Sequence, residues 1–448
     1  MTRGVRGALE RGDGMDRPRS SRWFYSYLPQ GIAGGATSAL IPLFAYGLGG
    51  SLSDVGIIAA ATSIASVPAF MLWGSLSDRL GRRKIFLLIG FLGNTVSFVF
   101  MAASRTLSEF YLANLLIGAL GAASGPVGTV LIMETTARAE WPSRLAFVSR
   151  IGAVGWVAGL GLGAVWLALG PALVGPGLDA MRALFLIGAA SGALSVLLAF
   201  LWTREPTKHV DRQTVQGTYA RPRVERGRYF PMWVLHYFDF RAPRPPDAKL
   251  PRSLRAYLVC VFLFFGGFTA FYGFFPIFLN QTYGLSGPEI FAVYIGSQAM
   301  SVAAYPYVGK WISSRRGASM QLYAVVGRSV LFGSFFAVGF VPMPSVGLLA
   351  LIFILHSGVG LCWAVINVAG STLVSHLAPV KGRAQAFGAY NAVQGFGSIL
   401  GPLLGGFTAE WLGYGPAFAV SVGLILSGSA VLAALSLGDG EAFLEKGK

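Results

Sequence analysis

The chain contains 448 residues, of which 54% are hydrophobic and 12% are charged, against the ~25% charge of an average soluble domain. This composition excludes a water-soluble globular protein. The long continuous apolar runs also exclude an outer-membrane barrel, whose strands alternate in polarity over ~10 residues, so membrane-spanning helices are expected. The net charge of +16 does not indicate nucleic acid, because the basic residues gather in the breaks between apolar runs, as the positive-inside rule requires.

Twelve apolar runs follow one another along the chain, and nearly all reach the ~20 residues that cross ~30 Å of hydrocarbon. We predict membrane spans at residues 23–47, 53–75, 85–103, 108–137, 145–170, 181–202, 254–280, 286–313, 320–341, 345–375, 383–410 and 415–437. An even number of spans puts both termini on one side, and the positive-inside rule makes that side the cytoplasm. The lipid bilayer of the inner (plasma) membrane is therefore the expected partner.

The longest polar break, which is rich in proline, separates the first six spans from the last six. The expected organisation is a cytoplasmic tail (1–22), a six-helix bundle (23–202), a cytoplasmic linker (203–253), a second six-helix bundle (254–437) and a second tail (438–448). Apolar residues recur at helical spacing within the linker, at Phe230, Trp233, Val234, Tyr237 and Phe238. They predict an amphipathic helix on the cytoplasmic face.

The two halves are related in sequence. Asp54 and Gly74, at the two ends of the second span, correspond to Glu289 and Gly309 in the eighth span, 235 residues later. Small residues also recur, as Gly155, Gly159 and Gly163 in the fifth span and as Gly397, Gly401, Pro402 and Gly405 in the eleventh. We interpret them as helix-packing positions, because small residues let helix backbones approach closely. A parallel repeat of six spans is typical of transporters that rock two bundles about a midplane site.

The segment from Gly74 to Lys84, GSLSDRLGRRK, joins the second and third spans. Gly81 permits a tight turn, Gly74 permits close approach of a neighbouring helix, and Asp78 can sit against a helix N-terminus. The arginines can bridge to carboxylates on adjoining helices, and Glu134 near the end of the fourth span is the predicted partner. The segment resembles the signature loop of the major facilitator superfamily, whose defining positions are all filled here.

The resemblance implies an all-α membrane protein with twelve transmembrane helices in two pseudo-symmetric six-helix bundles, working as a monomer by alternating access. It also implies that the loop latches the two halves together on the cytoplasmic side in the outward-open state. The expected gating residues are Gly74, Asp78, Arg79, Gly81, Arg82, Arg83 and Glu134. The glycines and the proline of the eleventh span have the spacing of the family's antiporter motif. In antiporters that motif is expected in the fifth span. Many proton antiporters of the family carry an arginine in the middle of the fourth span. This chain has Asn114 at the matching position, which counts against standard proton antiport.

The resemblance implies a substrate cavity lined mainly by spans one, four, seven and ten. The predicted substrate-binding residues are Tyr27, Gln30, Asn114, Arg150, Phe268, Tyr272, His356, Trp363 and Asn367. Span seven is crowded with aromatic residues and offers few hydrogen-bonding groups. Such a lining suits an amphiphilic solute better than a sugar.

Ionisable side chains inside the bilayer are costly and indicate function. Arg150 is expected either to bind an anionic group of the substrate or to pair with Glu134. The side chain of Arg328 is expected to extend along the ninth span, so that its guanidinium reaches the cytoplasmic interface. A histidine can titrate near neutrality, so His356 is the candidate for proton coupling, which makes protons a candidate partner; the alternative is a neutral histidine with satisfied hydrogen bonds.

The sequence therefore predicts a secondary active transporter that works by alternating access and exports amphiphilic small molecules. The alternative is an importer or exchanger of small organic anions or nutrients on the same fold. An enzyme is not expected, because no paired His or Asp/Glu cluster stands at catalytic spacing and no phosphate-binding Gly-Lys-Ser/Thr loop is present. No metal and no cofactor are expected.

Overall fold

The computed structural model describes residues 19–137, 140–206, 250–314, 317–378 and 383–438. Every regular element in these residues is a helix, and nine helical segments, one of them running from Leu107 to Thr135 as two consecutive helices, are long and apolar enough to cross a membrane. Three further membrane-length segments complete the set of twelve: α1 (Tyr27–Ser38) with α2 (Leu40–Gly47), α14 (Gly287–Ser314) and α17 (Arg383–Leu412). The predicted all-α membrane fold is confirmed.

The first half contains η1 (Arg19–Ser26), α1 (Tyr27–Ser38), α2 (Leu40–Gly47), α3 (Leu52–Leu80), α4 (Lys84–Ala103), α5 (Leu107–Gly121), α6 (Ser124–Thr135), α7 (Trp141–Leu169), α8 (Pro171–Val174) and α9 (Leu178–Trp202). The second half contains α13 (Arg252–Tyr283), α14 (Gly287–Ser314), α15 (Gly317–Val338), α16 (Ser345–Leu377), α17 (Arg383–Leu412) and α18 (Tyr414–Gly438). Two predicted spans are each built from two shorter helices, since the first breaks at Ala39 and the fourth breaks at residues 122–123. The predicted linker helix between Phe230 and Phe238 lies outside the described residues.

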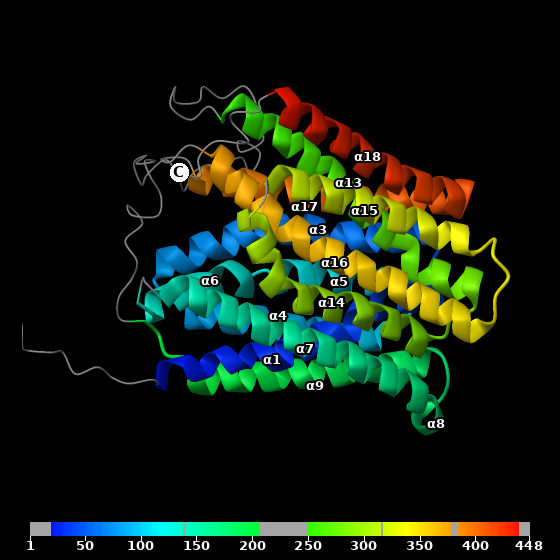
Figure 1. The fold of residues 1–448 in the computed structure, drawn as a ribbon. Coiled ribbons are helices and arrows are strands. Elements are labelled where there is room, and N and C mark those ends of the chain that lie inside the picture. Colours follow the sequence, from blue (N-terminus) through cyan, green and yellow to red (C-terminus); the bar gives the residue numbers. More distant parts are fainter. Residues whose placement is uncertain (1–18, 138–139, 207–249, 315–316, 379–382, 439–448) are drawn as a thin grey trace, which may run out of the picture.

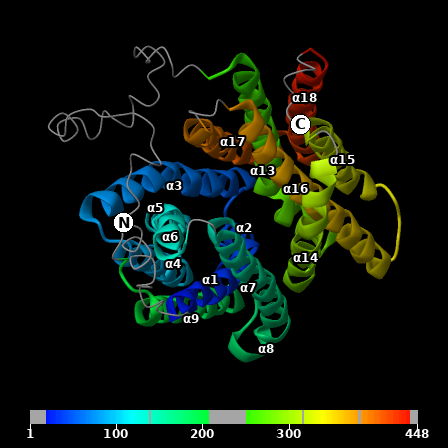
Figure 2. The ribbon, with the colours of Figure 1, turned by 60° about the vertical axis from the view of Figure 1, so that its left-hand side comes forward.

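The two halves form separate bundles that pack side by side. Figure 1 shows their helices running roughly parallel along the bundle, and Figure 2 shows α1 to α9 on one side and α13 to α18 on the other. The sequence repeat corresponds to a structural one at the start of α3 and α14. Asp54 accepts a hydrogen bond from the backbone of Ser51 at 2.8 Å, and Glu289 accepts one from the backbone of Ser286 at 2.7 Å. Each carboxylate satisfies an otherwise unpaired N–H at its helix start.

The glycine stripes lie at equivalent helix contacts in the two halves. A Cβ added to Gly155 or Gly159 of α7 would collide with the backbone of α1, and a Cβ added to Gly401 or Gly405 of α17 would collide with the backbone of α13. Gly397 also faces α13. These residues therefore hold helix backbones together within each half, as small residues do in membranes. Gly163 and Pro402 lie against residues of the opposite half, Phe291 and Gly56 respectively.

Candidate functional site

The Gly74–Lys84 loop ends α3 and begins α4. Gly81 has a φ of 64°, in the left-handed region that favours glycine, and ends α3 there. The hydroxyl of Ser77 donates to the carbonyl of Arg82 at 3.1 Å and closes the turn. Gly74 does not have the expected close neighbour, because no atom lies within 4 Å of a Cβ built on it in the described part of the chain. The corresponding Gly309 of α14 is equally open.

Arg83 is the centre of the loop's polar contacts. Its Nε and Nη2 donate to the two carboxylate oxygens of Glu134, both at 3.0 Å, and its Nη1 lies 2.5 Å from Asp78 Oδ1 and 2.9 Å from Ser77 Oγ. Burial alone would lower the pKa of Arg83, but the hydrogen bonds and negative charges of Glu134 and Asp78 outweigh it and raise the pKa above its ordinary value. The cluster thus fixes the loop to α6, within the first half.

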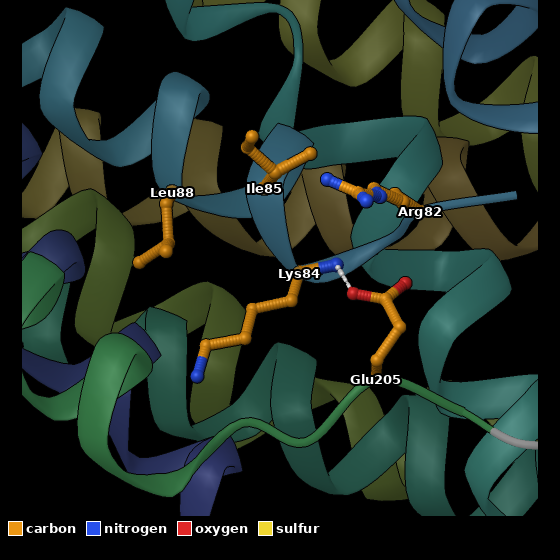
Figure 3. Close-up of a pocket in the computed structure, with 5 residues that line it drawn as sticks. All are labelled: Arg82, Lys84, Ile85, Leu88 and Glu205. Atoms are coloured by element: carbon orange, nitrogen blue, oxygen red, sulfur yellow. Dashed lines mark hydrogen bonds between the residues drawn. The ribbon is translucent and has the colours of Figure 1, made fainter. Parts of the chain in front are cut away.

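Glu205, which follows α9, caps the start of α4. Its carboxylate accepts hydrogen bonds from the backbone N–H groups of Arg83 and Lys84, the second at 3.1 Å. Figure 3 shows this carboxylate directed at the Lys84 backbone beside a shallow pocket of about 310 Å³ that also involves Ile85 and Leu88. A carboxylate at a helix N-terminus satisfies free N–H groups and complements the helix dipole. The cap therefore ties the beginning of the linker to the signature loop.

The remaining charged residues of the predicted gate and site lie apart. Arg79 and Arg82 are exposed. Glu134 pairs with Arg83, so the expected alternative pairing of Arg150 with Glu134 is not seen. The Arg150 side chain is exposed on α7 and forms no ion pair within the described residues.

The two halves contact each other at the end of the bundle opposite the Gly74–Lys84 loop. We call the loop side the basic end and the opposite side, where Leu52, Leu167, Gly287 and Glu410 lie, the closed end. At the closed end α3 packs on α17 and α7 packs on α14. The backbone N–H of Leu52 donates to Glu410 across the interface at 2.8 Å.

A second polar contact crosses between the halves at the closed end, from Gln281 to Tyr46. The side-chain amide of Gln281 donates to the Tyr46 hydroxyl at 2.5 Å, and the Tyr414 hydroxyl donates to the same glutamine. The contact of α3 with α17 extends inward to Val67, which lies beside Gly395. Gly74 lies two helical turns beyond Val67 on α3 and has no described residue of the second half within 4 Å of a Cβ built on it. The halves therefore separate toward the basic end.

Three predicted substrate-binding residues of the first half lie within its packing. Asn114 is 1% exposed and donates to the carbonyl of Phe110 at 2.8 Å, while its side-chain oxygen has no hydrogen-bond partner in the described part of the chain. Tyr27 packs edge-on against Phe91 with ring centroids 5.2 Å apart. The side-chain oxygen of Gln30 is buried without a hydrogen bond. These residues do not converge on one another.

The predicted residues of the second half do converge. Phe268 and Tyr272 of α13 meet His356 and Trp363 of α16, with the ring centroids of Phe268 and Trp363 6.4 Å apart and those of Tyr272 and His356 6.1 Å apart. Asn367 lies further along α16, is exposed, and donates to the Tyr305 hydroxyl at 3.3 Å.

His356 is 1% exposed, and both of its ring nitrogens have partners. Nδ1 lies 2.9 Å from the carbonyl oxygen of Val293, and Nε2 lies 3.3 Å from the Tyr272 hydroxyl. A carbonyl oxygen can only accept, so Nδ1 carries a hydrogen, and in the neutral ring Nε2 then accepts from tyrosine. This geometry is that of a neutral histidine with satisfied hydrogen bonds, and proton coupling through His356 stays an untested prediction.

Arg328 was expected at the cytoplasmic interface, and that expectation is wrong. Its residue exposure is 3%, and its guanidinium carbon lies 4.2 Å from the ring centroid of Phe268 and 5.2 Å from those of Phe332 and Trp363. The side chain points into the second half instead of along the helix to water, because the aromatic faces stabilise its charge there. Its position among the predicted binding residues makes it the main site residue that sequence reasoning missed. The signal was present, because a charge inside an apolar span indicates function.

Two helical bundles that meet at one end and separate toward the other are typical of membrane transport proteins. The family model for the Major Facilitator Superfamily matches residues 23–369 and, in a second match, 330–446. The chain belongs to this superfamily.

Among curated relatives, "Multidrug resistance protein 1" of Bacillus subtilis is 23% identical over 360 residues, which are 79% of either chain. "Putative multidrug resistance protein MdtD" of Shigella flexneri is 30% identical over 153 residues, which are 33% of this chain and 32% of its own. Among solved structures, a point mutant of the nucleoside transporter NupG has a TM-score of 0.71 at 15% identity and covers 93% of this chain and 100% of its own. The structural likeness shows the shared fold, and the names differ, since two are multidrug resistance proteins and one is a nucleoside transporter.

Proposed function

We propose that this protein is a secondary active transporter that exports amphiphilic small molecules from the cytoplasm by alternating access. The single observation that carries the proposal is the asymmetry of the contacts between halves, which join at the closed end and are open at Gly74 and Gly309. The basic end is the cytoplasmic side in this proposal, because its loops hold the arginines and lysines. The structure then corresponds to an inward-open state with both termini in the cytoplasm.

The amphiphilic substrate is supported by the aromatic cluster of the second half, in which Phe268, Tyr272 and Trp363 provide apolar faces with few hydrogen-bonding groups. Export is supported by the glycines and proline of α17 and by the multidrug resistance names of the relatives. In the outward-open state the Gly74–Lys84 loop would approach the second half, and the open space at Gly74 in this state is compatible with that movement.

Ligand-dependent thermal unfolding tests the substrate class. We expect amphiphilic aromatic compounds to raise the unfolding temperature of the purified protein, while sugars, nucleosides and small hydrophilic acids leave it unchanged. A ligand at 100 times its dissociation constant adds about 2.7 kcal/mol to the free energy of unfolding. Energised inside-out vesicles should then accumulate the stabilising compound. Stabilisation by the hydrophilic set alone would contradict the proposal, and energised uptake by right-side-out vesicles would show import.

The role of His356 is tested by a substitution that keeps its hydrogen bonds. In His356→Gln the amide can donate to Val293 and accept from Tyr272, but it cannot titrate. Because the neutral histidine is already satisfied in a buried site, we expect the variant to keep both substrate exchange and transport driven by a pH gradient in proteoliposomes. Loss of the gradient-driven transport with exchange intact would instead establish His356 as the proton carrier.

A further inference from the structure

A buried positive charge without a counterion lies inside the second half. Arg328 projects from α15 into an aromatic cage, which we define as Phe268, Tyr272, Phe332 and Trp363. The guanidinium carbon lies 4.2 to 5.8 Å from the four ring centroids. No carboxylate pairs with Arg328 in the described residues.

The cage compensates the charge of Arg328 only in part. Aromatic faces attract the cation, but they do not accept the in-plane N–H groups of a guanidinium in ordinary hydrogen bonds. The Nε and Nη1 atoms of Arg328 are buried and have no hydrogen-bond partner among the described residues. These two donors lie on different edges of the guanidinium plane, so each can donate a separate charge-assisted hydrogen bond to an oxygen of a carboxylate, a sulfonate or a phosphate.

The other polar groups around Arg328 do not replace the missing anion. Tyr272 is in polar contact with the guanidinium, and His356 and Cys362 interact with it electrostatically. His356 donates its Nδ1 hydrogen to Val293 and is neutral, and the tyrosine and the thiol are neutral groups as well. The cage therefore holds one full positive charge in the apolar part of the bundle, where an unpaired charge is costly and indicates function.

The cage is not equally buried on all sides. Phe268 and Phe332 are buried, whereas Tyr272 and Trp363 are half-buried. Phe265, which is also half-buried, continues the apolar surface beside Trp363, with ring centroids 6.0 Å apart. A ligand would therefore reach Arg328 past the tyrosine and the tryptophan, with an apolar body lying along Trp363 and Phe265.

We propose that Arg328 binds the anionic head group of the transported molecule, so that the substrates are amphiphiles with a carboxylate, sulfonate or phosphate on an aromatic or aliphatic body. This inference rests on the proposed function and names the substrate class for it. The aromatic cage supplies the apolar contacts, and the Nε and Nη1 groups select the negative charge.

Binding of matched probes tests the inference without transport. The probes are naphthalene-2-carboxylate and its neutral amide, which share one apolar body, and binding to the detergent-purified full chain is measured by calorimetry. We expect the wild type to bind the carboxylate about tenfold or more tightly than the amide, since a charge-assisted hydrogen bond from the guanidinium is stronger than a neutral one. Arg328→Met should lose this preference and bind the amide as before, and Arg328→Lys should keep part of it.

Thermal unfolding without a ligand separates this role from a structural one. Replacing an unpaired buried charge by an apolar side chain of similar length removes a desolvation penalty. Arg328→Met should therefore unfold at the same temperature as the wild type or a higher one. Arg182→Met, which removes a partly exposed arginine paired with Asp179, is the matched control and should leave probe binding unchanged. Equal carboxylate affinity in the wild type and Arg328→Met would overturn the inference.

Two further readouts keep the inference distinct from the proposed function and from a lipid site. Carboxylate binding that depends on Arg328, together with no transport of any amphiphile, would support the site and contradict the function. Transport of amphiphiles that is unaffected by Arg328→Met would support the function and overturn the site. Binding of short-chain phosphatidylglycerol that depends on Arg328, with no binding of the naphthalene carboxylate, would assign the anion to lipid and overturn the inference about the substrate.

Discussion

Replacing Arg83 by methionine is expected to lower the free energy of unfolding by about 3–5 kcal/mol, the cost of breaking a buried ion pair by removing one partner. The exposed side-chain fractions of Arg83 and Glu134 are 7% and 0%, so water cannot solvate the carboxylate in place of the guanidinium. The two parallel hydrogen bonds at 3.0 Å are lost together, as is the contact with Asp78. Unfolding by denaturant or heat in detergent measures the effect.

Two variants control for the source of this loss. Arg83→Met combined with Glu134→Leu should recover most of the stability, because the fully buried carboxylate is removed together with its partner, and Asp78, which also loses Arg83, is 23% exposed and can be solvated by water. Arg83→Lys should fall between the wild type and Arg83→Met, since a lysine cannot form the bidentate pair. An Arg83→Met protein as stable as the wild type would contradict the assignment of this cluster as the anchor of the loop.

Asp78→Asn distinguishes gating from stability in the same cluster. The Asp78 side chain is 23% exposed and the Arg83 pair with Glu134 remains in this variant, so we expect a stability loss within about 1 kcal/mol. Transport should nevertheless fall, because the proposed latch needs the loop to keep its shape as it approaches the second half. Unchanged transport in the stably folded variant would remove Asp78 from the gate.

Much of the fold was predictable because it depends on features that are local in sequence. Apolar length determines where helices cross the membrane, and the turn at Gly81 needs a residue that tolerates positive φ. The breaks at Ala39 and at residues 122–123 were not predicted, since the apolar run continues through both. The linker helix predicted between Phe230 and Phe238 lies outside the described residues.

The candidate site was predictable only in part, because it depends on how helices are rotated relative to one another. The aromatic residues of α13 and the polar residues of α16 were predicted as a group, and the second half brings Phe268, Tyr272, His356 and Trp363 together. The direction of Arg328 was missed, because hydropathy places a residue along a helix and not around it. The contact of Glu410 with Leu52 was not predicted either, because the two residues are 358 positions apart in the chain.

Alternating access requires the closed end to open during transport, and one contact there has the geometry for a disulfide. A Cβ built on Gly287 of α14 lies 3.8 Å from the Cβ of Leu167 of α7, the mean separation found in disulfides. We expect Leu167→Cys with Gly287→Cys, in a protein whose native thiols are replaced by Cys260→Ala and Cys362→Ala, to cross-link under mild oxidation. The bond would join the two halves at the closed end.

The most direct test is transport by this cross-linked protein in proteoliposomes. Oxidation should reduce transport to background while ligand binding from the basic end is retained, and reduction should restore transport. The single-cysteine variants and the cysteine-free parent should be insensitive to oxidation, which controls for damage by the oxidant. A fully cross-linked protein that transports at the rate of its reduced form would contradict alternating access through the closed end.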